Sequence, residues 1–170
     1  TAITTGDYNV AVGYQAGAEV DIGAGNTQIG YQAGDVNTTG NDNVAVGQTA
    51  LSADTKGTNS VAIGGAALQK QNFTTSTASY NTAVGRSAGK EITTGIYNTL
   101  IGGLAGDALT DADNNVAIGY QALSGDTLGS RSIAIGRGAL QVQNFTSATN
   151  TYNTVIGYGA LFYLKWFALK

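Results

Sequence analysis

The sequence predicts an all-β protein, a parallel β-roll or β-solenoid of nine 17-residue coils, with every fourth coil longer by four residues. Three observations support this prediction. A Val or Ile followed by glycine recurs along the whole chain. The residues before that step alternate with the two-residue period of a strand. Glycines also recur in every coil and interrupt most stretches that are long enough for a helix.

The recurring glycine fixes the length of the repeat. The spacings between successive glycines are 17, 17, 17, 21, 17, 17, 17 and 21. The longer units at 68–85 and 140–157 share one sequence pattern, so we predict two super-repeats, 13–84 and 85–156. We predict a corner at each of these glycines, where the backbone adopts positive φ or packs closely. They are Gly13, Gly30, Gly47, Gly64, Gly85, Gly102, Gly119, Gly136 and Gly157.

The β-branched residue before each glycine is predicted to form the structural core. This column is Val12, Ile29, Val46, Ile63, Val84, Ile101, Ile118, Ile135 and Ile156. The residue two positions earlier, mostly Val or Thr, shares its face, and Ala mostly occupies the opposite face. We predict that the Val/Ile column points inward. Ile118→Asp would then collapse several coils, because an unpaired buried charge is costly and coils depend on their neighbours.

An asparagine precedes most of the strands by one residue and is predicted to sit in a turn. Its side chain can bond nearby backbone or stack on the next coil as an amide ladder. The column is Asn9, Asn26, Asn43, Asn81, Asn98, Asn115 and Asn153, with Ser60 and Ser132 substituting.

The roll domain is predicted to span residues 1–161, and the segment "FYLKWFALK" at 162–170 breaks the repeat. This segment has no glycine and is too short to span a membrane, so we expect a cap on the open end of the roll or a junction. No signal peptide is recognisable. Because the chain starts at Thr1 and lacks methionine, we expect a processed product or a piece of a longer protein.

Composition excludes several classes of function. Eight scattered Lys and Arg and a net charge of −3 argue against nucleic-acid binding. The absence of His and Cys removes Ser-His and Cys-His pairs and thiolate metal sites. We therefore predict no enzyme, no catalytic residue, no metal and no cofactor. Asp111 and Asp113 offer oxygens suited to calcium, but other coils lack them, which favours a solvated turn.

Two phrases in the chain resemble known repeats. "NSVAIGGAAL" at 59–68 resembles the head repeat of trimeric autotransporter adhesins (YadA-like heads), and "NVAIGYQAL" at 115–123 resembles repeats of phage tail-fibre proteins. The resemblance covers residues 6–161. It implies a left-handed parallel β-roll, a homotrimer, an inward Val/Ile column and a role in surface attachment. The chain departs from the adhesin heads, whose repeat is about fourteen residues, and shows no neck or coiled-coil stalk.

The extended coils carry the candidate contact loops. Residues 69–80 and 141–152 each insert four residues and contain "QNFT". Loops on a rigid scaffold often bind partners, although these loops also fit a clasp that covers the roll. The candidate contact residues are Asn72, Phe73, Thr74, Asn144, Phe145 and Thr146. N-x-T sequons make Asn37, Asn72 and Asn144 candidate glycosylation sites.

Eight tyrosines fall into two columns that flank the predicted strands. They are Tyr14, Tyr31, Tyr120 and Tyr158 after the glycine, and Tyr8, Tyr80, Tyr97 and Tyr152 before the asparagine. Stacked rings along a roll suit a chain–chain interface, with a carbohydrate-binding strip as the alternative.

These observations predict a structural segment of an extracellular fibre: a surface adhesin, a phage tail fibre or a filament subunit. It would act as a rigid spacer and attachment surface. The expected partners are further copies of the chain, as a homotrimer or an end-to-end filament, and a host-surface receptor or glycan; we expect neither nucleic acid nor a membrane span. The alternative is an ice-binding or carbohydrate-binding solenoid, and ice binding requires a flat, regular array of Thr that Val and Ile interrupt here.

Overall fold

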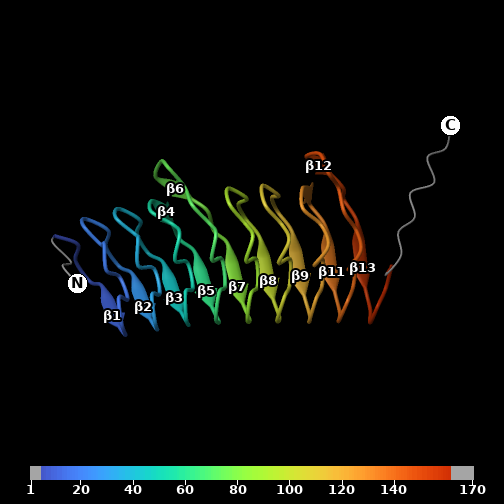
Figure 1. Ribbon diagram of the computed structural model, residues 1–170. Coiled ribbons are helices and arrows are strands. Elements are labelled where there is room, and N and C mark those ends of the chain that lie inside the picture. Colours follow the sequence, from blue (N-terminus) through green and yellow to red (C-terminus); the bar gives the residue numbers. More distant parts are fainter. Residues whose placement is uncertain (1–4, 162–170) are drawn as a thin grey trace.

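The computed structural model describes residues 5–161, which form one row of stacked coils (Figure 1). Each coil contributes a three-residue strand to one nine-stranded sheet, and every neighbouring pair is parallel. The β-solenoid predicted from the repeat is confirmed. The strands, in sheet order, are β1 (Val10–Val12), β2 (Thr27–Ile29), β3 (Val44–Val46), β5 (Val61–Ile63), β7 (Thr82–Val84), β8 (Thr99–Ile101), β9 (Val116–Ile118), β11 (Ile133–Ile135) and β13 (Thr154–Ile156).

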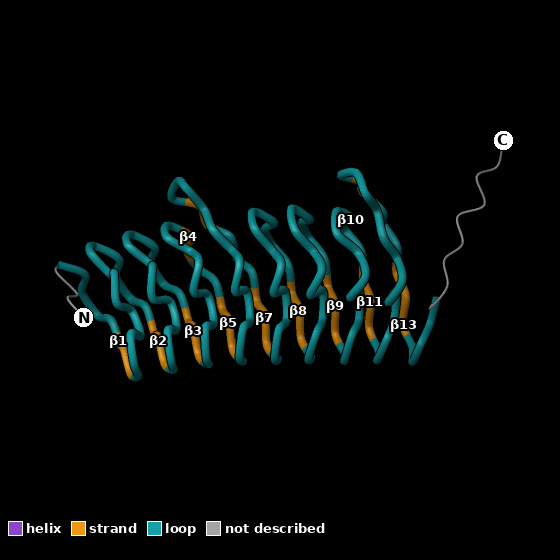
Figure 2. The backbone as a smooth tube through the Cα atoms, in the orientation of Figure 1, coloured by secondary structure: helices purple, strands orange, loops and turns teal. Residues whose placement is uncertain are grey.

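The rest of each coil consists of turns, with two short parallel pairs above the extended coils. β4 (Gly57–Thr58) pairs with β6 (Thr77–Ala78), and β10 (Gly129–Ser130) pairs with β12 (Thr149–Asn150). Figure 2 shows the strands of the nine-stranded sheet aligned along the row, with turns and loops making up the rest of each coil. Residues 5–161 contain no helix. The nine-stranded sheet is therefore the most extended regular element of the described chain.

The glycine that ends each strand is fixed by its backbone and by the next coil. All nine have φ between +127° and +137°, a region that other residues rarely adopt. A Cβ on Gly102 would lie 2.6 Å from the carbonyl oxygen of Gly119 in the next coil. The predicted glycine corners are thus confirmed by both the dihedral angle and the close approach of two backbones.

The prediction that the Val/Ile column lines the core is wrong. Every member of that column points outward and is at least partly exposed, with Val12 at 56% and Ile156 at 67%. The residue between the two outward positions faces inward instead, and Ala117 is fully buried. The coil is so flat that the space beneath the strand suits small side chains in most coils. The residues to which this correction applies are Val12, Ile29, Val46, Ile63, Val84, Ile101, Ile118, Ile135 and Ile156.

The large apolar side chains of the core lie at the second corner of the coil, in two alternating arrangements. In two successive coils a buried Leu has positive φ and the residue three positions later is polar. In the next two coils that Leu is replaced by glycine. A Cβ on Gly89 would then lie 2.7 Å from Leu100 and 3.1 Å from Ile92, so these side chains fill the space that Leu fills elsewhere. Different residues therefore fill the same corner in the two arrangements.

The asparagine column forms the predicted ladder between coils. Asn43 is buried, its Nδ2 donates to the Gly57 carbonyl at 2.8 Å, and its Oδ1 accepts the Ser60 N–H at 2.9 Å. Asn98 repeats both contacts with Ala112 and Asn115. Each amide therefore ties its own coil to the next, and stability is shared between neighbours as expected for a solenoid.

Candidate functional site

The outward side of the nine-stranded sheet carries a continuous row of mostly apolar side chains. We call it the sheet face and define it by the first and third residues of each strand. They are Val10, Val12, Thr27, Ile29, Val44, Val46, Val61, Ile63, Thr82, Val84, Thr99, Ile101, Val116, Ile118, Ile133, Ile135, Thr154 and Ile156. None of them is charged or buried. Nine strands at about 4.8 Å spacing make a strip about 40 Å long, and contiguous apolar patches of this kind usually mark an interface.

Tyrosines border the sheet face, and their stacking decides which chemistry they can offer. The rings of Tyr14 and Tyr31 lie 5.4 Å apart at 14°, and those of Tyr80 and Tyr97 lie 5.7 Å apart at 10°. Stacking covers one face of each ring in these two pairs. A sugar needs an open ring face, whereas a protein surface also packs against edges. The stacking therefore reduces the number of ring faces that a sugar could use in these two pairs.

Near the C-terminal end of the row, Arg137 lies among the tyrosines that border the sheet face. The Arg137 guanidinium lies 5.8 Å from the centre of the Tyr120 ring and 5.5 Å from that of Tyr158, and its Nη1 donates to the Tyr158 hydroxyl at 2.9 Å. Arg and Tyr are enriched in protein interfaces, because their long apolar surfaces and polar tips both find partners there.

The extended coils raise two loops above the row, at β6 and β12 in Figure 1. Asn72, Thr74, Asn144 and Thr146 are exposed on them, as expected of candidate contact residues. Phe73 is instead only 6% exposed and packs into the roll, so it is not free to contact a partner. The half-buried Phe145 is its equivalent in the second super-repeat. Phe73 therefore acts as a clasp, while the hydroxyl-rich tips remain available.

The glycosylation prediction is wrong for Asn37 and remains untested for the other two asparagines. Asn37 is 1% exposed and its Oδ1 accepts the Gly40 N–H at 2.8 Å, so the folded coil has no room for a glycan there. Asn72 and Asn144 are exposed, and their Oδ1 atoms accept hydrogen bonds from the hydroxyls of Thr55 and Thr127.

A buried polar cluster holds each raised loop, and sequence reasoning missed it. Gln71 Nε2 donates to Asp54 Oδ2 at 2.6 Å and to Ser60 Oγ at 2.8 Å, while its Oε1 accepts from Asn81 Nδ2 at 2.9 Å. Asp54 Oδ1 also accepts the Phe73 N–H at 3.2 Å. We call these residues the loop clamp. Ser60 stands where other coils have Asn, and the shorter side chain leaves room for the Gln71 amide.

The second super-repeat builds the same clamp from Asp126, Gln143, Ser132 and Asn153. The signal was present in the sequence, because serine replaces asparagine only in the two coils whose second corner carries glutamine and extends. Because the whole cluster recurs one super-repeat later, the loop clamp is a regular feature of the repeat that fixes both raised loops.

Asp54→Asn is expected to lower the free energy of unfolding by about 1–3 kcal/mol, because an amide donor would face the donor on Gln71 inside the roll. Asn37 is the equivalent of Asp54 in the preceding coil. Its amide meets no such donor, because the residue at this position in the next coil is not glutamine. The double variant Asp54→Asn with Gln71→Glu reverses the polarity of that bond and should recover part of the loss. Urea denaturation of the three proteins tests this; equal stability of wild type and the single variant would contradict it.

Three partly or fully buried aspartates set the pH dependence of stability. Burial raises the pKa of Asp35, Asp54 and Asp107 above the usual 3.8. The folded chain thus binds these protons more tightly than the unfolded chain. Their contribution to the free energy of unfolding therefore falls as the pH rises from about 3.8 through their folded pKa values, and is constant above them.

Asp107→Asn is expected to stabilise the protein modestly at pH 7, since Asp107 Oδ1 is buried without a hydrogen-bond partner among the described residues. The variant should also flatten the fall in stability between pH 4 and pH 7. The exposed Asp111→Asn is the matched control. Glu91 acts in the opposite direction, because the hydrogen bond from Lys70 lowers its pKa. Urea midpoints of Asp107→Asn and Asp111→Asn between pH 4 and pH 7 test this. A steeper fall of the midpoint with pH in Asp107→Asn than in the wild type would contradict the prediction.

Asp111 and Asp113 do not converge on a common point. Asp111 Oδ1 accepts from the Thr94 hydroxyl at 2.6 Å, and Asp113 Oδ1 accepts the Ile96 N–H at 2.8 Å. Among residues 5–161, no three His, Cys, Asp or Glu side chains lie close enough together to hold a metal ion. Both aspartates act as turn residues that join neighbouring coils.

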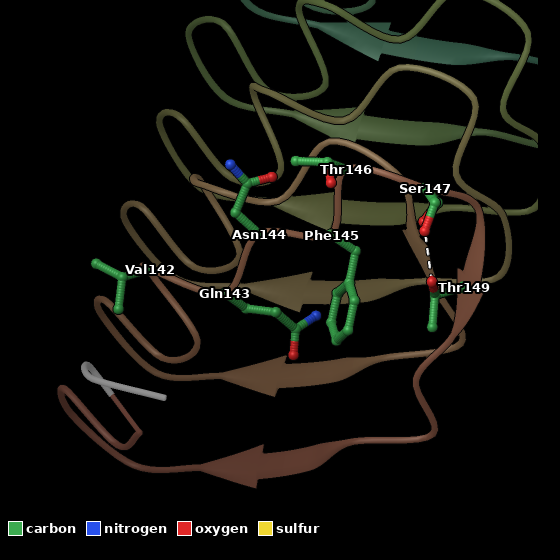
Figure 3. Close-up of a pocket in the computed structure, with 7 residues that line it drawn as sticks. All are labelled: Val142, Gln143, Asn144, Phe145, Thr146, Ser147 and Thr149. Atoms are coloured by element: carbon green, nitrogen blue, oxygen red, sulfur yellow. Dashed lines mark hydrogen bonds between the residues drawn. The ribbon is translucent and has the colours of Figure 1, made fainter. Parts of the chain in front are cut away.

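A cavity of about 510 Å³ lies under the second raised loop, at the C-terminal end of the row (Figure 3). It is lined by Val142, Gln143, Asn144, Phe145, Thr146, Ser147 and Thr149. The equivalent surface of the first super-repeat is covered by the following coil, where Lys70 N–H donates to the Lys90 carbonyl at 3.1 Å. The cavity is therefore the place of a following coil rather than an enclosed ligand pocket.

The chain matches no protein-family model, and comparison with curated proteins and with solved structures finds no significant match. Within the part of the chain that the structure describes, no helix has the length and apolar character needed to cross a bilayer.

Proposed function

We propose that this chain is a non-enzymatic structural segment of an extracellular fibre or appendage, in which copies pack together through the sheet face. The segment serves as a rigid spacer and carries its raised loops as attachment surfaces. The single observation behind this proposal is that the largest β-branched side chains lie on the outside, with Ile63 and Ile101 both 39% exposed. In a monomer such a strip costs solvation free energy along its whole length.

Three copies facing one axis would bury the strip, as the resemblance to adhesin heads and tail-fibre repeats implies. The stacked tyrosines and Arg137 would then line the edges of the contact, where they can pack and still reach water. The absence of His and Cys in the chain supports a structural role over a catalytic one.

Light scattering on the purified segment tests the proposal. We expect the mass of three chains for the wild type and of one chain for Ile118→Asp, because a charge in the middle of the contact is costly to bury. The matched control is Thr75→Asp, which places the same charge on the tip of a raised loop, away from the sheet. A monomeric wild type at high concentration would contradict association through this face.

Ice binding is a second candidate, supported by one feature of the sheet face. Thr27, Thr82, Thr99 and Thr154 all point outward at the first position of their strands, in register with Val or Ile elsewhere. A flat, regular array of methyl-bearing side chains is the kind of surface that orders water. Thermal hysteresis is measured for the wild type and for Ile133→Asp. Hysteresis in the wild type that is lost in the variant would support ice binding through the sheet face. Absence of hysteresis from both proteins would exclude ice binding.

A further inference from the structure

Around the cavity of Figure 3, the second super-repeat lacks two stacking hydrogen bonds that the first super-repeat forms. There, Lys70 N–H donates to the Lys90 carbonyl and Asn72 N–H to the Thr93 carbonyl, at 3.1 and 2.9 Å. The equivalents in the second super-repeat are the N–H groups of Val142 and Asn144, and neither has an acceptor within residues 5–161. Two parallel donors beside an open cavity are complementary to one further coil.

The repeat itself indicates which residues would lie there. Leu140 N–H donates to the Ala160 carbonyl at 3.1 Å, as Leu68 N–H does to Ala88 at 3.1 Å, so the register of the super-repeat holds as far as residue 160. The same offset assigns Phe162, Tyr163 and Leu164 to the positions of Lys90, Glu91 and Ile92.

Three neighbouring positions change their chemistry together between the super-repeats. In the first, Lys70 and Lys90 both form ion pairs with Glu91. In the second, the equivalent residues are Val142, Phe162 and Tyr163, so a charged cluster is replaced as a unit by an apolar one. Val142 lines the cavity and is 41% exposed, so an apolar partner could cover it.

Leu164 also suits the column that its register assigns. Ile92 is fully buried there, and Val20 and Leu109 occupy the same column in other coils. The corner residue before it, Leu161, replaces Gly89, whose Cβ would lie 2.7 Å from Leu100 of the following coil and 3.1 Å from Ile92. The second super-repeat has no equivalent of Leu100 after Leu161 among the described residues. The space that Leu100 fills in the first super-repeat is therefore open to Leu161 and Leu164 together in the second.

We propose that the cavity is the docking site of the chain's own segment 162–170, which covers the C-terminal end of the roll. Leu164 fills the apolar column and Tyr163 packs on Val142. The offset places Phe167 at the position of Gly95, whose Cβ would lie 2.4 Å from the Ala112 carbonyl of the following coil. A phenylalanine in this column excludes a further coil, so the docked segment also ends the stacking.

Hydrogen exchange of the full chain tests the docking, in an Ile118→Asp background that removes association through the sheet face. We expect the amides of Val142 and Asn144 to be protected, and Leu164→Asp to speed their exchange by about tenfold or more. Leu169→Asp is the matched control, because its register partner Tyr97 is an exposed residue. Equal exchange in the parent protein and in Leu164→Asp would overturn the proposal. So would protection that depends on protein concentration, since a second copy would then be the occupant.

A charge exchange provides an independent test with the same readout. Val142→Lys should speed the exchange of Asn144 by burying an unpaired charge under the segment. Adding Tyr163→Glu rebuilds the ion pair of Lys70 with Glu91 and should restore protection. Trp166, the one tryptophan of the chain, should become more accessible to acrylamide in Val142→Lys and recover in the double variant. A double variant that exchanges as fast as Val142→Lys would contradict the assigned register.

Discussion

Ala117→Asp is expected to unfold the centre of the roll, with a loss of more than about 3 kcal/mol, because an unpaired carboxylate would be buried in the core. Ala117 is fully buried and lies in register with Leu100 and Ala134 of the two neighbouring coils. The disruption would spread to both of those coils, because each coil is stabilised by the ones beside it.

The neighbouring variant Ile118→Asp is the control for position and for charge. Ile118 points outward, so its replacement should leave the stability of a single chain within about 1 kcal/mol of the wild type, as is usual for surface substitutions. Circular dichroism during urea denaturation compares Ile118→Asp with the double variant that also carries Ala117→Asp, both without association through the sheet face. Equal stability of these two proteins would mean that Ala117 does not lie in the core and that the opposite face of the strand points inward.

Gly102→Ala is expected to cost about 3 kcal/mol or more, since a positive φ of +132° and a backbone contact would both oppose the new methyl group. The closest atoms belong to the Gly119 carbonyl, at 2.6 Å, and they cannot move without separating two coils. The loss therefore combines local strain with broken stacking.

Gly103→Ala provides the matched comparison one residue away. A Cβ there would lie 3.5 Å from its nearest neighbour, the ring of Tyr120, and the residue has no positive φ. We expect this variant to match the wild type or exceed it slightly, because alanine restricts the unfolded chain. The melting temperatures of Gly102→Ala and Gly103→Ala test this comparison. Similar values for the two variants would mean that the coils are not stacked as described.

The repeat period, the strands and the glycine corners could be predicted because each depends on local geometry. Gly102 and Gly119 recur at one phase, and a β-branched pair before them specifies a strand. The direction of the core could not be predicted in the same way. Period-two alternation assigns Ala117 and Ile118 to opposite faces but does not say which face lies inside, and the usual preference for burying the larger side chain gave the wrong answer.

That preference failed because the interior of a coil is bounded by its opposite wall. The space under the strand is filled by Ala in most coils, and bulkier Leu100 is accommodated only between Gly89 and Gly106. The loop clamp escaped prediction for a related reason. Asp54, Ser60 and Gln71 are far apart in one dimension and meet only when coils stack, so their joint recurrence in the second super-repeat was the one available sign.

The alternation of two glycine coils with two leucine coils limits how the rod can change in length. Loss or gain of a single coil would bring two large side chains together, or leave a void where neither is present. Only a block of four coils restores the order, so growth by duplication would proceed by whole super-repeats, each about 19 Å long. Each step would add one more raised loop at the same interval, so the number of raised loops would be proportional to the length of the rod.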